Sequence, residues 1–167
     1  MTEPNSVRPV IWLTGASSGI GRATAIERGL RGYRLALTAR GVELLEEVRN
    51  YLISTGANAE NIAVFPADVT SNEEVKGVYA QICKLFRRVD ILFANAGGHI
   101  PSESGRFETA EYKKLFELNL FGVLNCIEAV LADMLTNRAG HIVGVSSVEG
   151  YRALTPAAAY GASKYAL

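Results

Sequence analysis

Short apolar runs alternate with longer amphipathic segments along the whole chain. Runs of four or five mostly apolar residues, each followed by a turn rich in small or polar residues, predict buried β-strands at residues 10–13, 34–38, 62–65, 90–94 and 141–145. The segments between them have apolar residues at the spacing of a helix face. They predict helices at residues 22–32, 42–55, 71–87 and 109–137.

This alternation determines how the strands should be arranged. A strand, a helix and a second strand in succession form a crossover that is almost always right-handed, so the strands should lie parallel with the helices packed on the sheet. We therefore predict the α/β class, with an open, doubly wound parallel sheet in which five strands are present. A chain of 167 residues has the length of one domain, so residues 1–167 are expected to form a single domain.

The composition excludes several classes of function. Hydrophobic residues make up 49% of the chain, and 17 basic side chains balance 17 acidic ones. That balance leaves no electrostatic footprint for nucleic acid or an anionic membrane. No uninterrupted apolar run approaches the ~18 residues of a membrane span, and the polar N-terminus does not resemble a signal peptide, so we expect a cytoplasmic protein. Cys83 and Cys126 are expected to be reduced, buried thiols, and no metal site is expected.

A glycine-rich turn joins the first strand to the first helix. Residues 14–21 read Thr-Gly-Ala-Ser-Ser-Gly-Ile-Gly. Glycines let the backbone approach an anion closely, and the free N–H groups of the first helical turn point at it. The turn is therefore a candidate phosphate site, although a glycine-rich turn without a ligand could have the same sequence.

Further turns follow the next strands at the same edge of the predicted sheet. Arg40 could hold a ribose 2′-phosphate, where Asp or Glu would bind the free hydroxyls, or it could simply be solvated. Asp68 could accept a hydrogen bond from an adenine amino group or cap the turn before a helix. Asn95, Ala96 and Gly97 leave space after the fourth strand. Ligands of open parallel sheets lie across such an edge, so these turns predict a nucleotide site.

Candidate catalytic residues lie beyond the fifth strand. Tyr160 and Lys164 are four residues apart on a predicted helix and so share one face. An ammonium close to a phenol favours the phenolate and lowers the phenol pKa, which makes the pair a proton donor and acceptor. Ser147 follows the fifth strand and could hold a carbonyl oxygen. His99 has no evident partner in its loop, and His141 is expected to be structural.

The longest predicted helix contains an interior amide. Asn119 lies between two leucines, where its side chain could either bond only to its neighbours or serve the site. The same helix has more apolar surface than one face of a sheet needs, and this surplus indicates a subunit contact.

Together these motifs resemble the single-domain form of the short-chain dehydrogenase/reductase family over essentially the whole chain. The resemblance rests on Thr14-Gly15-x-x-x-Gly19-x-Gly21, Asp68-Val69, Asn95-Ala96-Gly97, Asn119, Ser147 and Tyr160-x-x-x-Lys164. It implies a Rossmann-type NAD(P)-binding domain. It also implies an oxidoreductase that interconverts a carbonyl and a secondary alcohol of a small-molecule substrate by hydride transfer.

The resemblance assigns a role to each of these residues. Tyr160 would be the general acid/base, Ser147 would orient the carbonyl or alcohol, and Asn119 would hold a water in the proton path. Lys164 would bind the nicotinamide ribose and lower the tyrosine pKa. Cofactor contacts would come from Thr14, Gly15, Ser17, Ser18, Gly19, Ile20, Gly21, Arg40, Asp68, Val69, Asn95, Ala96, Gly97, Tyr160 and Lys164. Arg40 after the non-acidic Ala39 is similar to the NADP-preferring members, so NADP is expected ahead of NAD.

The sequence departs from the family pattern in two places. Ala94 stands where many members have Asn, and the sequence ends at Leu167, where members continue with further strands. The resemblance therefore implies a C-terminally truncated, impaired chain whose full-length form is a homo-oligomer. One alternative is a non-catalytic remnant that binds nucleotide or a partner subunit. Another is a sugar-nucleotide epimerase of the extended branch, which the Gly-x-x-x-Gly-x-Gly spacing disfavours.

Overall fold

The computed structural model describes residues 8–100, 107–152, 154 and 157–167. The polar N-terminal segment considered above lies outside these ranges, as do three residues expected in loops, Pro101, Gly105 and Pro156.

One parallel sheet forms the centre of the described structure. Its strands are β1 (Val10–Thr14), β2 (Arg34–Thr38), β3 (Ile62–Val64), β4 (Ile91–Ala94) and β5 (His141–Gly144). The strand order is β3-β2-β1-β4-β5, and every neighbouring pair is parallel. The order reverses between β1 and β4, which is the topological switch point at which such sheets bind ligands. The predicted Rossmann-type sheet is confirmed, with β5 at one edge of the described strands.

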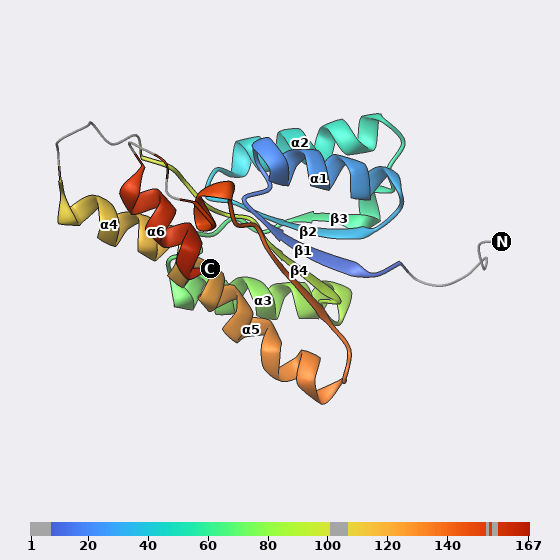
Figure 1. The fold of residues 1–167 in the computed structure, drawn as a ribbon. Helices are drawn as coiled ribbons and strands as arrows, with labels where there is room; N and C mark the ends of the chain where they lie inside the picture. The colour runs from blue at the N-terminus through green and yellow to red at the C-terminus, as the bar shows by residue number, and fades with distance from the viewer. Residues whose placement is uncertain (1–7, 101–106, 153, 155–156) are drawn as a thin grey trace.

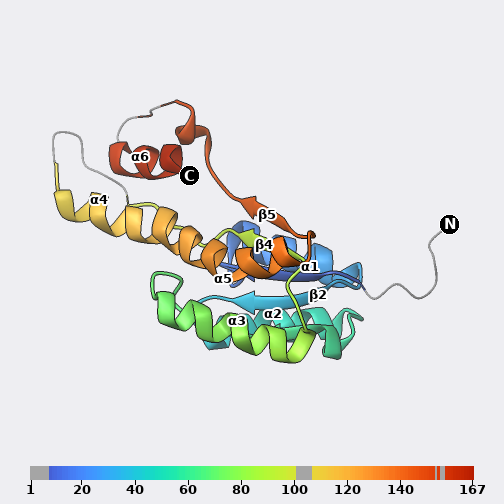
Figure 2. The ribbon, with the colours of Figure 1, turned by 90° about the horizontal axis from the view of Figure 1, so that it is seen from below.

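Helices cover both faces of the sheet (Figures 1 and 2). The helices of one layer are α1 (Gly19–Leu30) and α2 (Val42–Ser54), and those of the other are α3 (Asn72–Phe86) and α5 (Gly122–Thr136). Successive strand residues point to opposite faces, so Trp12 packs in the core under α3 and α5 while Leu13 packs in the core under α1 and α2. A short 3₁₀ turn, η1 (Ala59–Asn61), precedes β3.

The predicted helix at residues 109–137 contains an irregular turn. Here α4 (Thr109–Phe116), the π-helical turn η2 (Glu117–Phe121) and α5 follow one another without a break. Such turns add one residue to a helical turn and are frequent at functional sites. α4 extends beyond the sheet and packs against α6 (Ala158–Ala166), which follows the 3₁₀ turn η3 (Val148–Gly150) (Figure 1).

The continuous helix Thr109–Thr136 is long and apolar enough to cross a membrane by length and composition alone, with a mean hydropathy of 1.6 over its most apolar window. The sequence interpretation did not anticipate such a segment. Its inner face packs into the core through Val123, Cys126 and Val130. Core helices of soluble proteins pass the same test, so this one helix is weak evidence for a span.

Candidate active site

Asn95 fastens the glycine-rich turn to the end of β4. The backbone N–H groups of Asn95 and Ala96 both donate to Oγ1 of Thr14, at 3.1 Å each. The Asn95 side chain donates to the carbonyl oxygens of Thr14, at 3.1 Å, and Gly15, at 3.3 Å. Asn95 therefore cross-links the ends of β1 and β4, a role that the sequence interpretation, which treated the segment as a space-clearing turn, did not include.

Close backbone approach explains two of the glycines. Gly15 has a φ of +66°, and a Cβ built on it would lie 2.9 Å from Cα of Ala96. A Cβ on Gly21 would collide with the carbonyl oxygen of Gly15. The first turn of α1 therefore packs directly on the backbone of the preceding turn, which no larger residue would permit.

The N-terminus of α1 is open toward the cavity side of this turn. Ser18 is the N-cap residue, but its side chain makes no capping hydrogen bond, and the first turn contains no acidic residue. Apart from its chain neighbours and the backbone of its own helix, no described heavy atom lies within 4 Å of the position that a Cβ on Gly19 would take. The free N–H groups and the positive end of the helix dipole are thus available to an anion.

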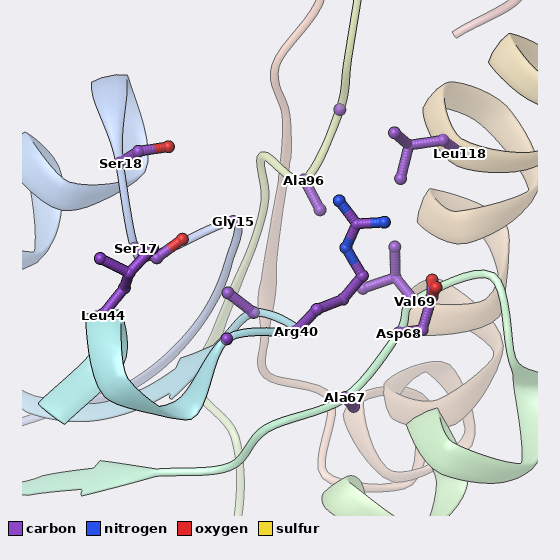
Figure 3. A pocket seen from close by; sticks show the side chains of 13 residues that line it. Gly15, Ser17, Ser18, Arg40, Leu44, Ala67, Asp68, Val69, Ala96 and Leu118 are labelled. Carbon is purple, nitrogen blue, oxygen red and sulfur yellow. The ribbon is translucent and has the colours of Figure 1, made fainter.

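A cavity of about 300 Å³ adjoins the turn, as Figure 3 shows. Its lining comes from the turns after β1 to β4, from the first turn of α2 and from the long helix, namely Gly15, Ser17, Ser18, Ala39, Arg40, Gly41, Leu44, Ala67, Asp68, Val69, Ala96, Gly97 and Leu118. The structure therefore brings the four predicted turns together around one space. Five predicted cofactor contacts do not line this cavity, namely Thr14, Gly19, Ile20, Gly21 and Asn95.

Arg40 is the cation of this cavity. Its side chain extends across the space toward Ala96 and Leu118, away from the two serines of the glycine-rich turn (Figure 3). In the described part of the chain its guanidinium forms no salt bridge. The charge is therefore not neutralised by a carboxylate and can pair with a ligand.

Asp68 stabilises the turn before α3, which is one of the two roles that its sequence position allowed. Its Oδ1 accepts hydrogen bonds from the backbone N–H of Thr70, at 3.0 Å, and from the Thr70 hydroxyl, at 2.8 Å. Its own N–H donates to Oε2 of Glu74 at 2.8 Å, which ties the turn to the start of α3. The carboxylate thus stabilises the turn while also bordering the cavity.

Asn119 is fully buried in the π-helical turn. Its Oδ1 accepts from the N–H of Gly98 at 2.8 Å, and its Nδ2 donates to the carbonyl of Gly98 at 2.9 Å and to Oγ of Ser163 at 2.9 Å. The amide therefore connects three segments: the long helix, the turn after β4 and α6. Bonding to neighbours, one of the two options left open by the sequence, is what the structure shows for this side chain.

Lys164 is buried, with 6% of its surface exposed. Its Nζ donates to the carbonyl of Val145, just beyond β5, at 2.7 Å. Burial lowers the pKa of Lys164 because it removes water from the ammonium. A Cβ on Gly97 would lie 3.4 Å from this Nζ and 3.1 Å from Oδ1 of Asn119, so Gly97 leaves the space between them open at the cavity edge.

The segment after β5 is held beneath α6. Ser146 donates from Oγ to the carbonyl of Lys164 at 2.9 Å, and a Cβ on Gly150 would lie 2.8 Å from the same oxygen. Ser147 is the N-cap of η3, where its Oγ accepts from the N–H of Glu149 at 3.2 Å. The hydroxyl proton of Ser147 is not used in that bond and can be donated to another group.

Tyr160 is half-buried on α6, and its ring meets that of His99 edge to face, with centroids 4.9 Å apart and planes at 87°. The interpretation that His99 lacks a partner is therefore wrong. Sequence spacing could not reveal this contact, because His99 and Tyr160 come from different segments of the chain.

Both cysteines are free thiols, as expected. Cys126 is buried in α5, and burial raises its pKa to about 12. The expectation that both thiols are buried is wrong for Cys83, which is only half-buried on α3. Its pKa is also raised, mainly through burial.

Comparisons with known proteins agree with this geometry. The family model for short chain dehydrogenase matches residues 9–167. An uncharacterized oxidoreductase of Listeria monocytogenes is 38% identical over 158 residues, which cover 95% of this chain and 62% of that protein.

Two similar solved structures contain related cofactors. The alcohol dehydrogenase of the archaeon Thermococcus sibiricus, complexed with 5-hydroxy-NADP, has a TM-score of 0.86 and 29% identity over 95% of this chain and 66% of that one. An actinorhodin polyketide ketoreductase with NADPH has a TM-score of 0.88 and 31% identity over 95% of this chain and 60% of that one. The chain thus spans about 62% of the length of the Listeria relative and a similar share of these structures.

Proposed function

Because the family model covers residues 9–167, the chain belongs to the short-chain dehydrogenase family of oxidoreductases, and we propose that it acts on a carbonyl or a secondary alcohol with NADP(H). The substrate would be a small molecule. A cytoplasmic location remains our expectation from the composition.

The placement of Lys164 supports this reaction best. Burial and the 2.7 Å bond to Val145 fix its ammonium one helical turn from Tyr160 and beside Gly97 at the cavity edge. An ammonium on the same helix face as the phenol would stabilise the negative charge that develops on the tyrosine oxygen as its proton is transferred.

The residues of the site would divide the proton chemistry among them. The Tyr160 phenol would protonate the carbonyl oxygen during reduction and remove the hydroxyl proton during oxidation, and Ser147 would donate a hydrogen bond to the same oxygen. A nicotinamide dinucleotide, when bound, would supply or accept the hydride. Asn119 would hold a water in the proton path through the Oδ1 lone pair that Gly98 does not use.

The cavity fits the adenosine half of such a cofactor. The open N-terminus of α1 would bind the pyrophosphate, as uncapped helix N-termini do. Asp68 and Val69 border the space for the adenine, and Arg40 would pair with the 2′-phosphate after turning toward Ser17 and Ser18. The cofactors of the two solved structures described above, 5-hydroxy-NADP and NADPH, support this choice of NADP.

We also propose that the protein is a homo-oligomer. Four large apolar residues of the long helix, Phe121, Leu124, Leu131 and Leu135, are 41% to 67% exposed. Contact of this surface with a second subunit would remove its apolar area from water.

NADPH consumption with a panel of ketones and aldehydes tests the proposed reaction. We expect turnover in a protein of the relatives' length that contains this chain, and its loss in Tyr160→Phe. Cofactor binding without turnover of any carbonyl or alcohol would instead favour the alternative, a non-catalytic nucleotide-binding protein.

A further inference from the structure

A second cavity, of about 520 Å³, lies at the amino ends of β1, β2 and β4. Its charged lining is Arg34, Arg87, Arg88 and Asp90. This edge of the sheet is opposite the one that carries the glycine-rich turn, since all the strands are parallel (Figure 1). We refer to this cavity as the arginine groove.

Two of the three guanidinium groups are fixed by their Nε atoms. Arg34 donates from Nε to the carbonyl of Arg8 at 3.0 Å, and its guanidinium lies 5.8 Å from the ring centre of Phe86. Arg88 pairs through Nε with Oδ1 of Asp90 at 2.7 Å. Because these bonds use Nε, the terminal nitrogens of both side chains remain available to a ligand.

Asp90 is the acidic group of the groove, and both of its oxygens are already used. Oδ1 pairs with Arg88, while Oδ2 accepts from the backbone N–H of Val10 at 2.8 Å. Three arginines against one carboxylate leave two positive charges in the lining.

Arg87 occupies a backbone position that favours glycine. It is the C-cap of α3, with a φ of +77°, and its N–H donates to the carbonyl of Cys83 at 2.8 Å. A side chain in this region of φ is strained. In the described part of the chain, no hydrogen bond or ion pair of the Arg87 guanidinium offsets that strain. Strained residues of this kind are concentrated at functional sites.

We propose that the arginine groove binds a phosphomonoester dianion carried by a small apolar group. A phosphomonoester carries a charge of about −1.5 to −2 at neutral pH, which matches the two uncompensated positive charges. Guanidinium forks bind phosphate oxygens in pairs. The apolar part would lie against Pro9, Phe86 and Ile91, and the volume is within the roughly 300 to 1,000 Å³ usual for small-molecule sites.

Arg87→Gly separates ligand binding from structural support. Calorimetric titration with phenyl phosphate and with inorganic phosphate should show about tenfold to a hundredfold weaker binding in this variant, with phenyl phosphate the tighter ligand of the parent. The melting temperature should stay the same or rise, because glycine suits a positive φ. A large fall in melting temperature with unchanged affinity would show that Arg87 supports the fold and would overturn the proposal.

Arg138→Gly is the matched control, since Arg138 is the other described non-glycine residue with a positive φ, +49°, and does not line the groove. It removes the same charge from another position with a positive φ, so phosphate affinity should not change. If both variants weakened phosphate binding equally, the electrostatic field of the protein as a whole would explain the binding, and a specific site in the arginine groove would be contradicted.

Two further experiments distinguish a lipid headgroup from a free phosphomonoester and test whether the ligand binds in the cavity beside the glycine-rich turn instead. Arg40→Ala should leave phenyl phosphate affinity unchanged, and loss of binding in that variant alone would move the ligand to the nucleotide cavity and refute the groove. Vesicles containing phosphatidic acid test a lipid headgroup, and binding to them that Arg87→Gly weakens would support the same recognition of a phosphomonoester. Failure of phenyl phosphate, inorganic phosphate and these vesicles to bind would refute the proposal.

Discussion

Asn119 and Ser163, 44 positions apart in the sequence, are joined by a buried hydrogen bond of 2.9 Å from Nδ2 to Oγ. The same Ser163 hydroxyl donates to the carbonyl of Tyr160 at 2.7 Å. The π-helical turn is therefore linked through one hydroxyl to the backbone of the proposed acid/base. This link gives Asn119 a positioning role in addition to any contact with water.

Asn119→Ala should lower both stability and turnover. It leaves the N–H and carbonyl of Gly98 and the Ser163 hydroxyl without this partner, and one unpaired buried group costs about 1 to 3 kcal/mol. Thermal unfolding and kcat measured on the variant test this, with the exposed Asn137→Ala as the control. Equal melting temperatures for the two variants would contradict a structural function for the Asn119 amide.

Tyr160→Phe should abolish turnover while cofactor affinity stays nearly unchanged, because the phenol is proposed to transfer a proton and not to anchor the nucleotide. General acid/base catalysis contributes roughly 10² to 10⁴ in rate. Steady-state kinetics and a cofactor titration decide the matter. Activity above about one hundredth of the parent's would rule out proton transfer by Tyr160.

Lys164→Met should weaken both cofactor binding and turnover, since the ammonium is proposed to serve the ribose and the tyrosine together. Fluorescence titration with NADPH and steady-state rates measure the two effects separately. A variant that kept the parent's cofactor affinity and lost only turnover would show that Lys164 acts on Tyr160 and does not bind the ribose.

The buried ammonium of Lys164 also predicts a pH dependence of stability. Its folded pKa is lowered from 10.5 by burial, so between the folded value and 10.5 the unfolded chain binds the extra proton. The free energy of unfolding of the parent should therefore rise with pH across that window relative to Lys164→Met. Urea unfolding of both proteins at several pH values gives the difference, and a constant difference would show that burial does not disfavour the charged form.

Arg40→Ala should reduce the preference for NADPH over NADH. A charge-assisted hydrogen bond contributes about 1.5 to 3 kcal/mol, which corresponds to roughly tenfold to a hundredfold in affinity. Titration of parent and variant with both cofactors measures it, and NADH affinity serves as the internal control. Equal dissociation constants for the two cofactors in the parent would contradict the proposed pairing of Arg40 with the 2′-phosphate.

Leu131→Glu should dissociate the proposed homo-oligomer, because it places a charge within the exposed apolar stripe of the long helix. Sedimentation velocity gives the oligomeric state. Leu85→Glu is the matched control, since Leu85 is an exposed leucine on α3 outside this stripe. A parent that sediments as a monomer would contradict the proposal directly.

Most of the fold could be predicted from the sequence, because the strands are short apolar runs with turn residues after them. β2 has the predicted bounds, and the other strands differ by a residue at one end. The π-helical turn could not be predicted, because the apolar spacing of the long helix continues through it. Its cause lies in tertiary contacts, since Asn119 bonds to Gly98 and Ser163, which are distant in sequence.

Part of the geometry of the candidate site also follows from the sequence. The residues around the cavity of about 300 Å³ follow from one rule, that parallel strands end at one edge, and Arg40, Asp68 and Ala96 meet there. Side-chain partners do not follow from that rule. The contacts of Asn95 with Thr14, and of His99 with Tyr160, depend on how far two backbones approach each other, which no local pattern encodes.

The contact between Gly21 and the Gly15 carbonyl limits how cofactor preference could be redesigned. In a library that randomised residues 14–21, variants with a side chain at Gly15 or Gly21 would not fold correctly, because that side chain would collide with backbone. Gly19 faces open space, but its φ of +52° restricts replacements to the few residues, such as Asn, that tolerate it. Ser17 and Ser18 line the cavity without these constraints. Directed evolution toward another dinucleotide can therefore substitute these two residues and Arg40.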